Sequence, residues 1–83
     1  MNEREIRAAV LRALRDIAPE ANPDALDDTA TLREALDLDS MDFLHLITAL
    51  HAALRVDVPE ADYAKVQTMK GMVAYLASKL PDS

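Results

Sequence analysis

The 83-residue chain contains no cysteine and no tryptophan, and it has only one glycine. Without cysteine it can form no disulfide scaffold, no thiolate nucleophile and no thiolate metal site. A single glycine argues against a glycine-rich phosphate-binding loop and against turn-dense all-β folds. The length fits one small domain with one core, not an enzyme of two lobes. We therefore expect a single domain over residues 1–83, with its core at about residues 3–80.

Basic residues are also scarce, since 9 lysines and arginines stand against 15 acids and give a net charge of −6. Nucleic-acid binding needs clustered basic residues, so this balance argues against nucleic acid and favours basic protein surfaces as partners. No segment approaches the roughly 20 apolar residues that a membrane-spanning helix needs. Charged residues interrupt every apolar run near the N-terminus, so we expect no secretory signal and a cytoplasmic protein.

The N-terminal half predicts one long helix followed by a long acidic connection. The helix spans about residues 3–17, with Asn2 and Glu5 in the positions of a capping box, and Pro19 and Pro23 end it. Residues 18–39 carry seven acids and one base, Arg33. A disordered linker would seldom hold so many leucines, so we expect an ordered loop with a helical turn near residues 32–36.

The C-terminal half predicts two more long helices. The first begins at Asp39 or Ser40, ends near Leu54, and buries a stripe of Leu44, Ile47, Leu50 and Leu54 flanked by Leu46. The second is capped by Thr68, runs to Leu80 before Pro81, and has a core face of Met69, Met72, Val73, Leu76 and Leu80. Between them, residues 56–58 read as an extended connector and residues 60–65 as a helical turn. Buried stripes on three helices predict an all-α bundle of three long helices plus one short helix, with a long loop after the first.

The most informative stretch is residues 36–44, in which Asp39 and Ser40 precede an apolar helix. Both residue types are common helix caps, because their side-chain oxygens accept the first free backbone amides. On this evidence alone a cap is the simpler interpretation. A serine at a helix N-terminus also lies where free amides and the helix dipole stabilise an anion such as a phosphodiester.

The order of these features over residues 3–80 resembles the acyl carrier protein family, which includes peptidyl and aryl carrier domains. The run Asp39–Asp42 matches the family's Asp-Ser-Leu-Asp motif. The resemblance implies an acyl-carrier-like bundle in which Ser40 receives a covalent 4′-phosphopantetheine arm from coenzyme A. The arm's thiol then holds an acyl group as a thioester, so the protein itself is a carrier and not an enzyme.

The resemblance also implies roles for the neighbours of the serine. Asp39 and Asp42 fall on the acids of the modification and partner-recognition motif, and Met41 falls on the exposed apolar residue that contacts partner enzymes. The implied partners are a phosphopantetheinyl transferase, an acyl-loading ligase or synthase, and acyl-transferring enzymes with basic docking patches. We expect a monomeric carrier for a fatty-acid, polyketide or lipid-modifying pathway.

The chain departs from the family pattern at two places. Asp37 stands where the family usually has glycine, which restricts the backbone and adds charge beside the site. The second helix of typical fatty-acid carriers is rich in glutamates, whereas the matching positions here hold His45, His51, Ala52 and Ala53. These departures favour a specialised carrier that works with a dedicated synthase or ligase.

Other interpretations stay open at this point. The chain could be a stand-alone peptidyl or aminoacyl carrier, or an unmodified interaction module in which Ser40 is only a cap. An acid–base enzyme using Asp39 and Asp42 is a weaker hypothesis, because a surface helical turn offers no pocket or catalytic partner. A metal site is also disfavoured, because the six residues from His45 to His51 turn about 240° around the helix beyond a full turn, so the two do not share a face.

Overall fold

The computed structural model describes residues 2–20, 22 and 26–80, which form a helical bundle. Its elements are α1 (Glu3–Ile17), α2 (Leu32–Ala35), α3 (Ser40–Leu54), the 3-10 helix η2 (Glu60–Val66) and α4 (Met69–Lys79). Over these described ranges the only β-type pairing is an isolated bridge between Thr31 and Thr68. The expected all-α bundle is confirmed, and the expected turns at residues 32–36 and 60–65 are α2 and η2.

Helix α1 has the predicted bounds because its caps define both ends. The Glu5 amide donates to Asn2 Oδ1 at 2.8 Å and the Asn2 amide donates to Glu5 Oε1 at 3.2 Å, which completes the capping box. The helix ends two residues before Pro19, and Pro23 lies outside the described residues. Its buried face packs against both α3 and α4 and consists of Ile6, Val10, Ala13 and Leu14.

The buried face of α3 differs from the predicted stripe. Leu44 is 41% exposed, whereas Leu46, expected only to flank the stripe, is 0% exposed. The buried residues are Phe43, Leu46, Ile47, Leu50 and Leu54. Most residues of this helix are apolar, so several rotational phases fit the helical spacing almost equally well. The prediction for Leu44 is therefore wrong, although the helix bounds are confirmed.

Helix α4 begins as predicted and buries a slightly different face. The Gly71 amide donates to Thr68 Oγ1 at 3.0 Å, which confirms Thr68 as the cap. Val73 and Leu80 were expected in the core but are only partly buried, while Tyr75 is buried beside Met69, Met72 and Leu76. Pro81 lies outside the described residues.

Helices η2 and α4 meet in a close seam. A Cβ atom built on Gly71 would lie 2.6 Å from the backbone oxygen of Lys65, which is closer than real Cβ atoms come. The Tyr75 hydroxyl donates to Asp62 Oδ2 at 2.7 Å across the same seam. The single glycine of the chain is therefore explained by a close backbone approach.

From Leu26 onward, the acidic connection is attached to the bundle at several points. Leu32 and Leu38 are buried, as the leucine content of this segment predicted. The Leu32 amide donates to the Gln67 carbonyl at 2.8 Å, and the Lys70 amide donates to the Asp28 carbonyl at 3.0 Å. The first bond fixes α2 against the loop that precedes α4, and the second fixes the connection before α2 against the first turn of α4.

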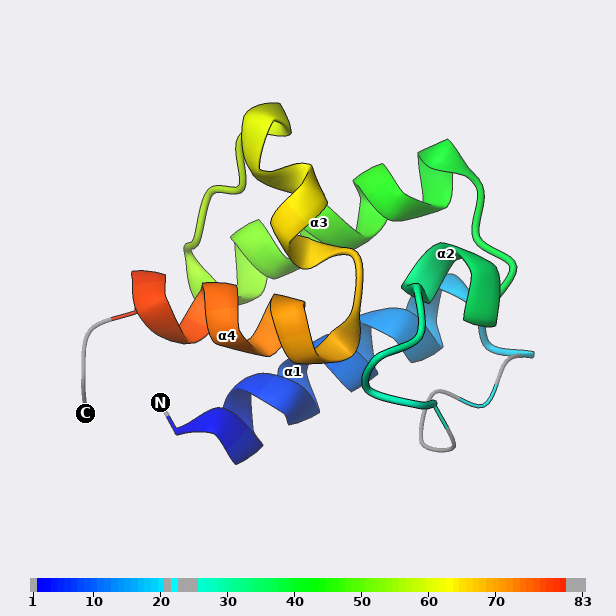
Figure 1. The fold of residues 1–83 in the computed structure, drawn as a ribbon, viewed down its shortest axis with the longest axis horizontal. Helices are drawn as coiled ribbons and strands as arrows, with labels where there is room; N and C mark the ends of the chain where they lie inside the picture. The colour runs from blue at the N-terminus through cyan, green and yellow to red at the C-terminus, as the bar shows by residue number, and fades with distance from the viewer. Residues whose placement is uncertain (1, 21, 23–25, 81–83) are drawn as a thin grey trace.

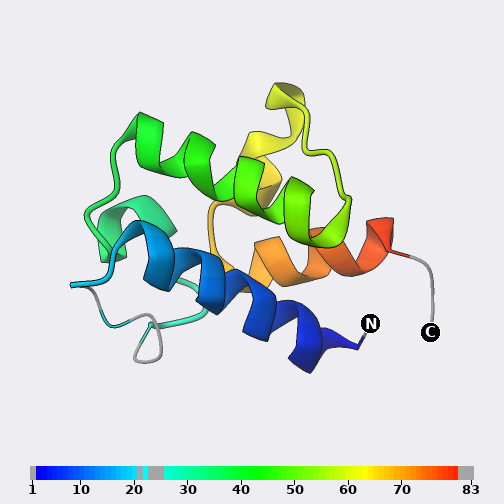
Figure 2. The ribbon, with the colours of Figure 1, turned by 180° about the vertical axis from the view of Figure 1, so that it is seen from behind.

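Figure 1 and Figure 2 show which elements gather at each end of the molecule. The end of α1, helix α2 and the start of α3 lie together at one end, and the start of α1 and the end of α4 lie at the other. Within the part of the chain that the structure describes, no helix has both the length and the hydropathy needed to cross a bilayer.

Candidate functional site

Ser40 is the first residue of α3 and its side chain is exposed. The preceding residue, Asp39, is the N-cap, and its Oδ1 accepts the Asp42 amide at 2.8 Å. Asp42 returns the contact, because its Oδ2 accepts the Asp39 amide at 3.3 Å. The two acids of the motif thus form a capping box that fixes the backbone on both sides of Ser40.

An arginine from α2 reaches the serine side chain. Arg33 Nη2 donates to Ser40 Oγ at 3.2 Å, although the last residues of α2 and the following turn separate the two in the sequence. The backbone of Arg33 is also fixed, because its carbonyl accepts the Leu38 amide at 2.8 Å. This contact was not predicted from the sequence. The one feature that could have indicated it is that Arg33 is the sole base of residues 18–39.

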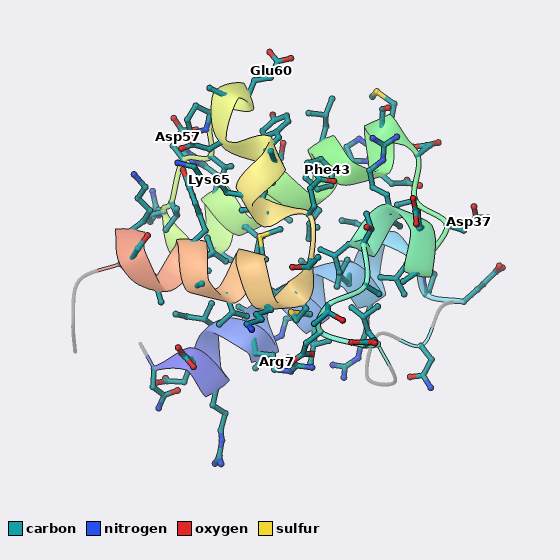
Figure 3. All side chains as sticks on the ribbon, viewed as in Figure 1. Arg7, Asp37, Phe43, Asp57, Glu60 and Lys65 are labelled. Atoms are coloured by element: carbon teal, nitrogen blue, oxygen red, sulfur yellow. The ribbon has the colours of Figure 1, made fainter. Side chains whose placement is uncertain are left out.

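The turn between α2 and α3 contains the residue that replaces the family's glycine. Asp37 has a φ of 54°, in the left-handed region that glycine adopts most easily. Aspartate is among the few other residue types that enter this region readily. Figure 3 shows the labelled Asp37 at the outer edge of this turn, and its side chain is exposed. The departure from glycine is therefore compatible with the same turn.

The outer face of α3 next to the serine is apolar. Met41 is 59% exposed and Leu44 is 41% exposed, and both follow Ser40 within the first turns of the helix. His45 and His51 are exposed on the same helix, and no acid follows Asp42 in it. The exposure of Met41 is what the sequence led us to expect, and the exposure of Leu44 enlarges the apolar surface.

The groups with perturbed acidity lie away from the serine. Hydrogen bonds from the backbone and side chain of Thr29 lower the pKa of Asp27. The hydrogen bond from Tyr75 lowers the pKa of Asp62, and the same bond raises the pKa of Tyr75 to about 12. Among the described residues, no cluster of three or more histidines and acids is placed to hold a metal ion.

The surroundings of Ser40 fit a phosphodiester. Its hydroxyl is accessible to another enzyme, and the guanidinium of Arg33 already donates to its oxygen. The Ser40 and Met41 amides belong to the first turn of α3, where a helix leaves its N–H groups without internal partners. Together these donors match the acceptor oxygens of a phosphate.

Comparisons with known proteins give one consistent result. Residues 5–76 match the family described as "Phosphopantetheine attachment site". The chain is 30% identical to the acyl carrier protein of Helicobacter hepaticus over 71 residues, which cover 86% of this chain and 87% of that protein. It is 28% identical to the acyl carrier protein of Thermosynechococcus vestitus over 80 residues, which cover 96% of this chain and 98% of that protein.

A solved structure is similar to the whole chain. The solution structure of a proposed acyl carrier protein from Anaplasma phagocytophilum superposes with a TM-score of 0.84 at 29% sequence identity. The superposition covers 100% of this chain and 97% of the other. The resemblance that was first noted on the motif around Ser40 therefore extends over the entire fold.

Proposed function

The chain belongs to the acyl carrier protein family, whose members hold acyl groups on a covalent 4′-phosphopantetheine, and we propose that Ser40 is the attachment residue. Proteins of this family are carriers and not enzymes, and they interact with a phosphopantetheinyl transferase and with acyl-handling enzymes. When attached, the group supplies a thiol on a flexible arm. We further propose that the chain forms a single carrier domain with its core over residues 3–80.

One observation supports Ser40 above all others. It is an exposed serine at the first position of a 15-residue helix, and a guanidinium donates to its hydroxyl oxygen. Ser78 is the other serine among the described residues, and its hydroxyl donates to the Tyr75 carbonyl at 2.7 Å near the end of α4. Ser78 therefore lacks both the helix N-terminus and the cationic neighbour.

The neighbours of Ser40 have separable roles in this proposal. Asp39 and Asp42 hold the backbone of the first turn through their capping box, and they form part of the motif that partner enzymes recognise. Met41 and Leu44 offer an exposed apolar surface beside the attachment point. Because apolar side chains gain free energy when an interface removes them from water, we assign them to partner docking.

The partners are proposed to be more specialised than those of a general fatty-acid carrier. The outer face of α3 holds His45, His51 and alanines where the family has glutamates, so basic docking patches find little acidic charge there. Acidic charge is instead concentrated before Ser40, in residues 18–39. We propose a cytoplasmic carrier that receives its acyl group from a dedicated ligase or synthase of a fatty-acid, polyketide or lipid-modifying pathway.

Incubation with coenzyme A and a broad-specificity phosphopantetheinyl transferase tests the attachment. Intact-mass measurement should show the wild type gaining one phosphopantetheine and Ser40→Ala gaining none. Ser78→Ala is the matched control, because it removes the other described serine and should gain the same mass as the wild type. No gain on the wild type would leave Ser40 as a helix cap and the protein as an interaction module.

A further inference from the structure

Arg33 is a cation held in an acidic part of the surface. It is the sole base in residues 18–39, and the exposed acids Glu34, Asp37 and Asp39 lie within six residues of it in the sequence. The contact that the structure gives its guanidinium is nevertheless a neutral hydroxyl, that of Ser40 at 3.2 Å. A guanidinium has five N–H donors in a planar fork, and this hydrogen bond uses only one of them.

The position of Arg33 is fixed from two sides. Its neighbour Leu32 is fully buried, and the Leu32 amide donates to Gln67 in the loop before α4. Its own carbonyl accepts the Leu38 amide, two residues before Ser40. The backbones of Arg33 and Ser40 are therefore held at a defined separation, so little conformational entropy is lost when the guanidinium binds near the serine oxygen.

Modification of Ser40 would change the charge that Arg33 faces. A phosphodiester on Ser40 adds one negative charge next to the carboxylates of Asp39 and Asp42. Its charged oxygens belong to the phosphorus that bonds to Oγ, the atom that Arg33 already contacts. Guanidinium–phosphate pairs form two parallel charge-assisted hydrogen bonds, which are stronger than a bond to a neutral hydroxyl.

We propose that Arg33 is the phosphate-binding residue of this carrier and holds the Ser40 phosphodiester between α2 and the first turn of α3. This inference rests on the proposed attachment at Ser40 and adds a function to a residue outside the serine motif. The pair offsets the repulsion between the phosphodiester and the neighbouring acids. It also makes modification strengthen the link between α2 and α3.

The test compares how modification changes stability in the wild type, Arg33→Gln, Arg33→Lys and Arg55→Gln. Arg55 is exposed at the other end of α3, so it is the matched control for losing one positive charge. Intact mass first establishes that each sample is modified, and thermal unfolding is then measured for both forms. We expect modification to raise the Tm of the wild type by roughly 2–6 °C more than that of Arg33→Gln, a typical size for an exposed pair.

Three further readouts make the outcome specific to a phosphate contact. Arg33→Lys should keep part of the stabilisation, because a lysine retains the charge but loses the planar fork. High salt should reduce the wild-type advantage, because exposed charges are screened. In NMR spectra of the wild type, the Arg33 side-chain N–H signals should shift on modification while those of Arg55 stay in place.

The failures can be told apart. A wild type that gains no mass refutes the attachment at Ser40 and, with it, the phosphate contact of Arg33. A wild type that gains the mass, with equal Tm changes in Arg33→Gln and unmoved Arg33 signals, refutes only the phosphate contact. If Arg33→Gln resists the transferase, the NMR signals of the modified wild type decide the question.

Discussion

The start of α3 and the seam between η2 and α4 are held together by different kinds of interaction. At the start of α3 the residues around Ser40 are exposed and linked by hydrogen bonds between polar groups, including the Arg33 contact. At the seam, Gly71 permits a close backbone approach and Tyr75 is buried against its neighbours. Exposed polar contacts contribute little stability, whereas burial contributes much, so function and stability reside in different parts of this bundle.

The largest expected effect is a difference in stability between variants on the buried and exposed faces of α3. Leu46→Ala should lower the free energy of unfolding by about 2–5 kcal/mol, because it removes a fully buried side chain. Leu44→Ala should change it by no more than about 0.5 kcal/mol, because that side chain is partly in water. Chemical denaturation of both variants checks the corrected phase of the helix. Equal losses would contradict the assignment of Leu44 to the surface.

The seam between η2 and α4 should not accommodate a methyl group added at Gly71. Gly71→Ala should destabilise the protein by about 1–3 kcal/mol, because its Cβ would collide with the Lys65 carbonyl. In an ordinary exposed helix the same change stabilises by about 1 kcal/mol. Ala74→Gly, on the exposed side of α4, is the reverse control and should cost about 1 kcal/mol. A stabilising Gly71→Ala would show that the seam can open without cost.

The first turn of α3 should respond more weakly. Asp39→Ala should lower stability by about 1 kcal/mol, because it removes the acceptor for the Asp42 amide. Asp39→Asn keeps an equally good cap and should retain wild-type stability while losing the charge. Comparing the rates at which a transferase modifies the two variants separates the structural role of Asp39 from recognition. If Asp39→Asn is stable and is modified at the wild-type rate, the transferase does not recognise the charge of Asp39.

The smallest expected effect is a pH dependence at the seam. Because the hydrogen bond to Asp62 raises the pKa of Tyr75 from 10.0 to about 12, its stabilising contribution is complete below pH 10.0 and is lost as pH rises towards 12. The Tm of the wild type should therefore fall more over this range than that of Tyr75→Phe. The same bond lowers the pKa of Asp62 below 3.8, so its contribution is also lost under strong acid. Parallel alkaline losses in the two proteins would show that the bond adds nothing.

The sequence predicts element boundaries better than contacts between elements. Helices α1 and α3 have their predicted bounds because Asn2–Glu5 and Asp39–Asp42 are local capping boxes. Leu44 was placed wrongly on the buried face of α3, because apolar residues occur around most of the circumference of this helix. A helix without a polar face does not reveal its rotation from spacing alone.

In the candidate site, too, the local features were predicted and the contact between elements was not. Ser40, Asp39, Met41 and Asp42 were selected from a local motif, and the structure places them in the first turn of one helix. Arg33 was treated only as the exception in an acidic segment, because its proximity to Ser40 depends on how α2 folds back. That placement depends on the burial of Leu32 and on a bond to Gln67, which are tertiary contacts.

Fragmentation mass spectrometry of the modified wild-type protein shows which residue carries the phosphopantetheine. The protein is incubated with coenzyme A and the transferase, cleaved into peptides, and the modified residue is located by fragmentation. We predict phosphopantetheine on Ser40, with none on Ser78 or on the threonines. Phosphopantetheine on any other residue, or none anywhere in the chain, would contradict it.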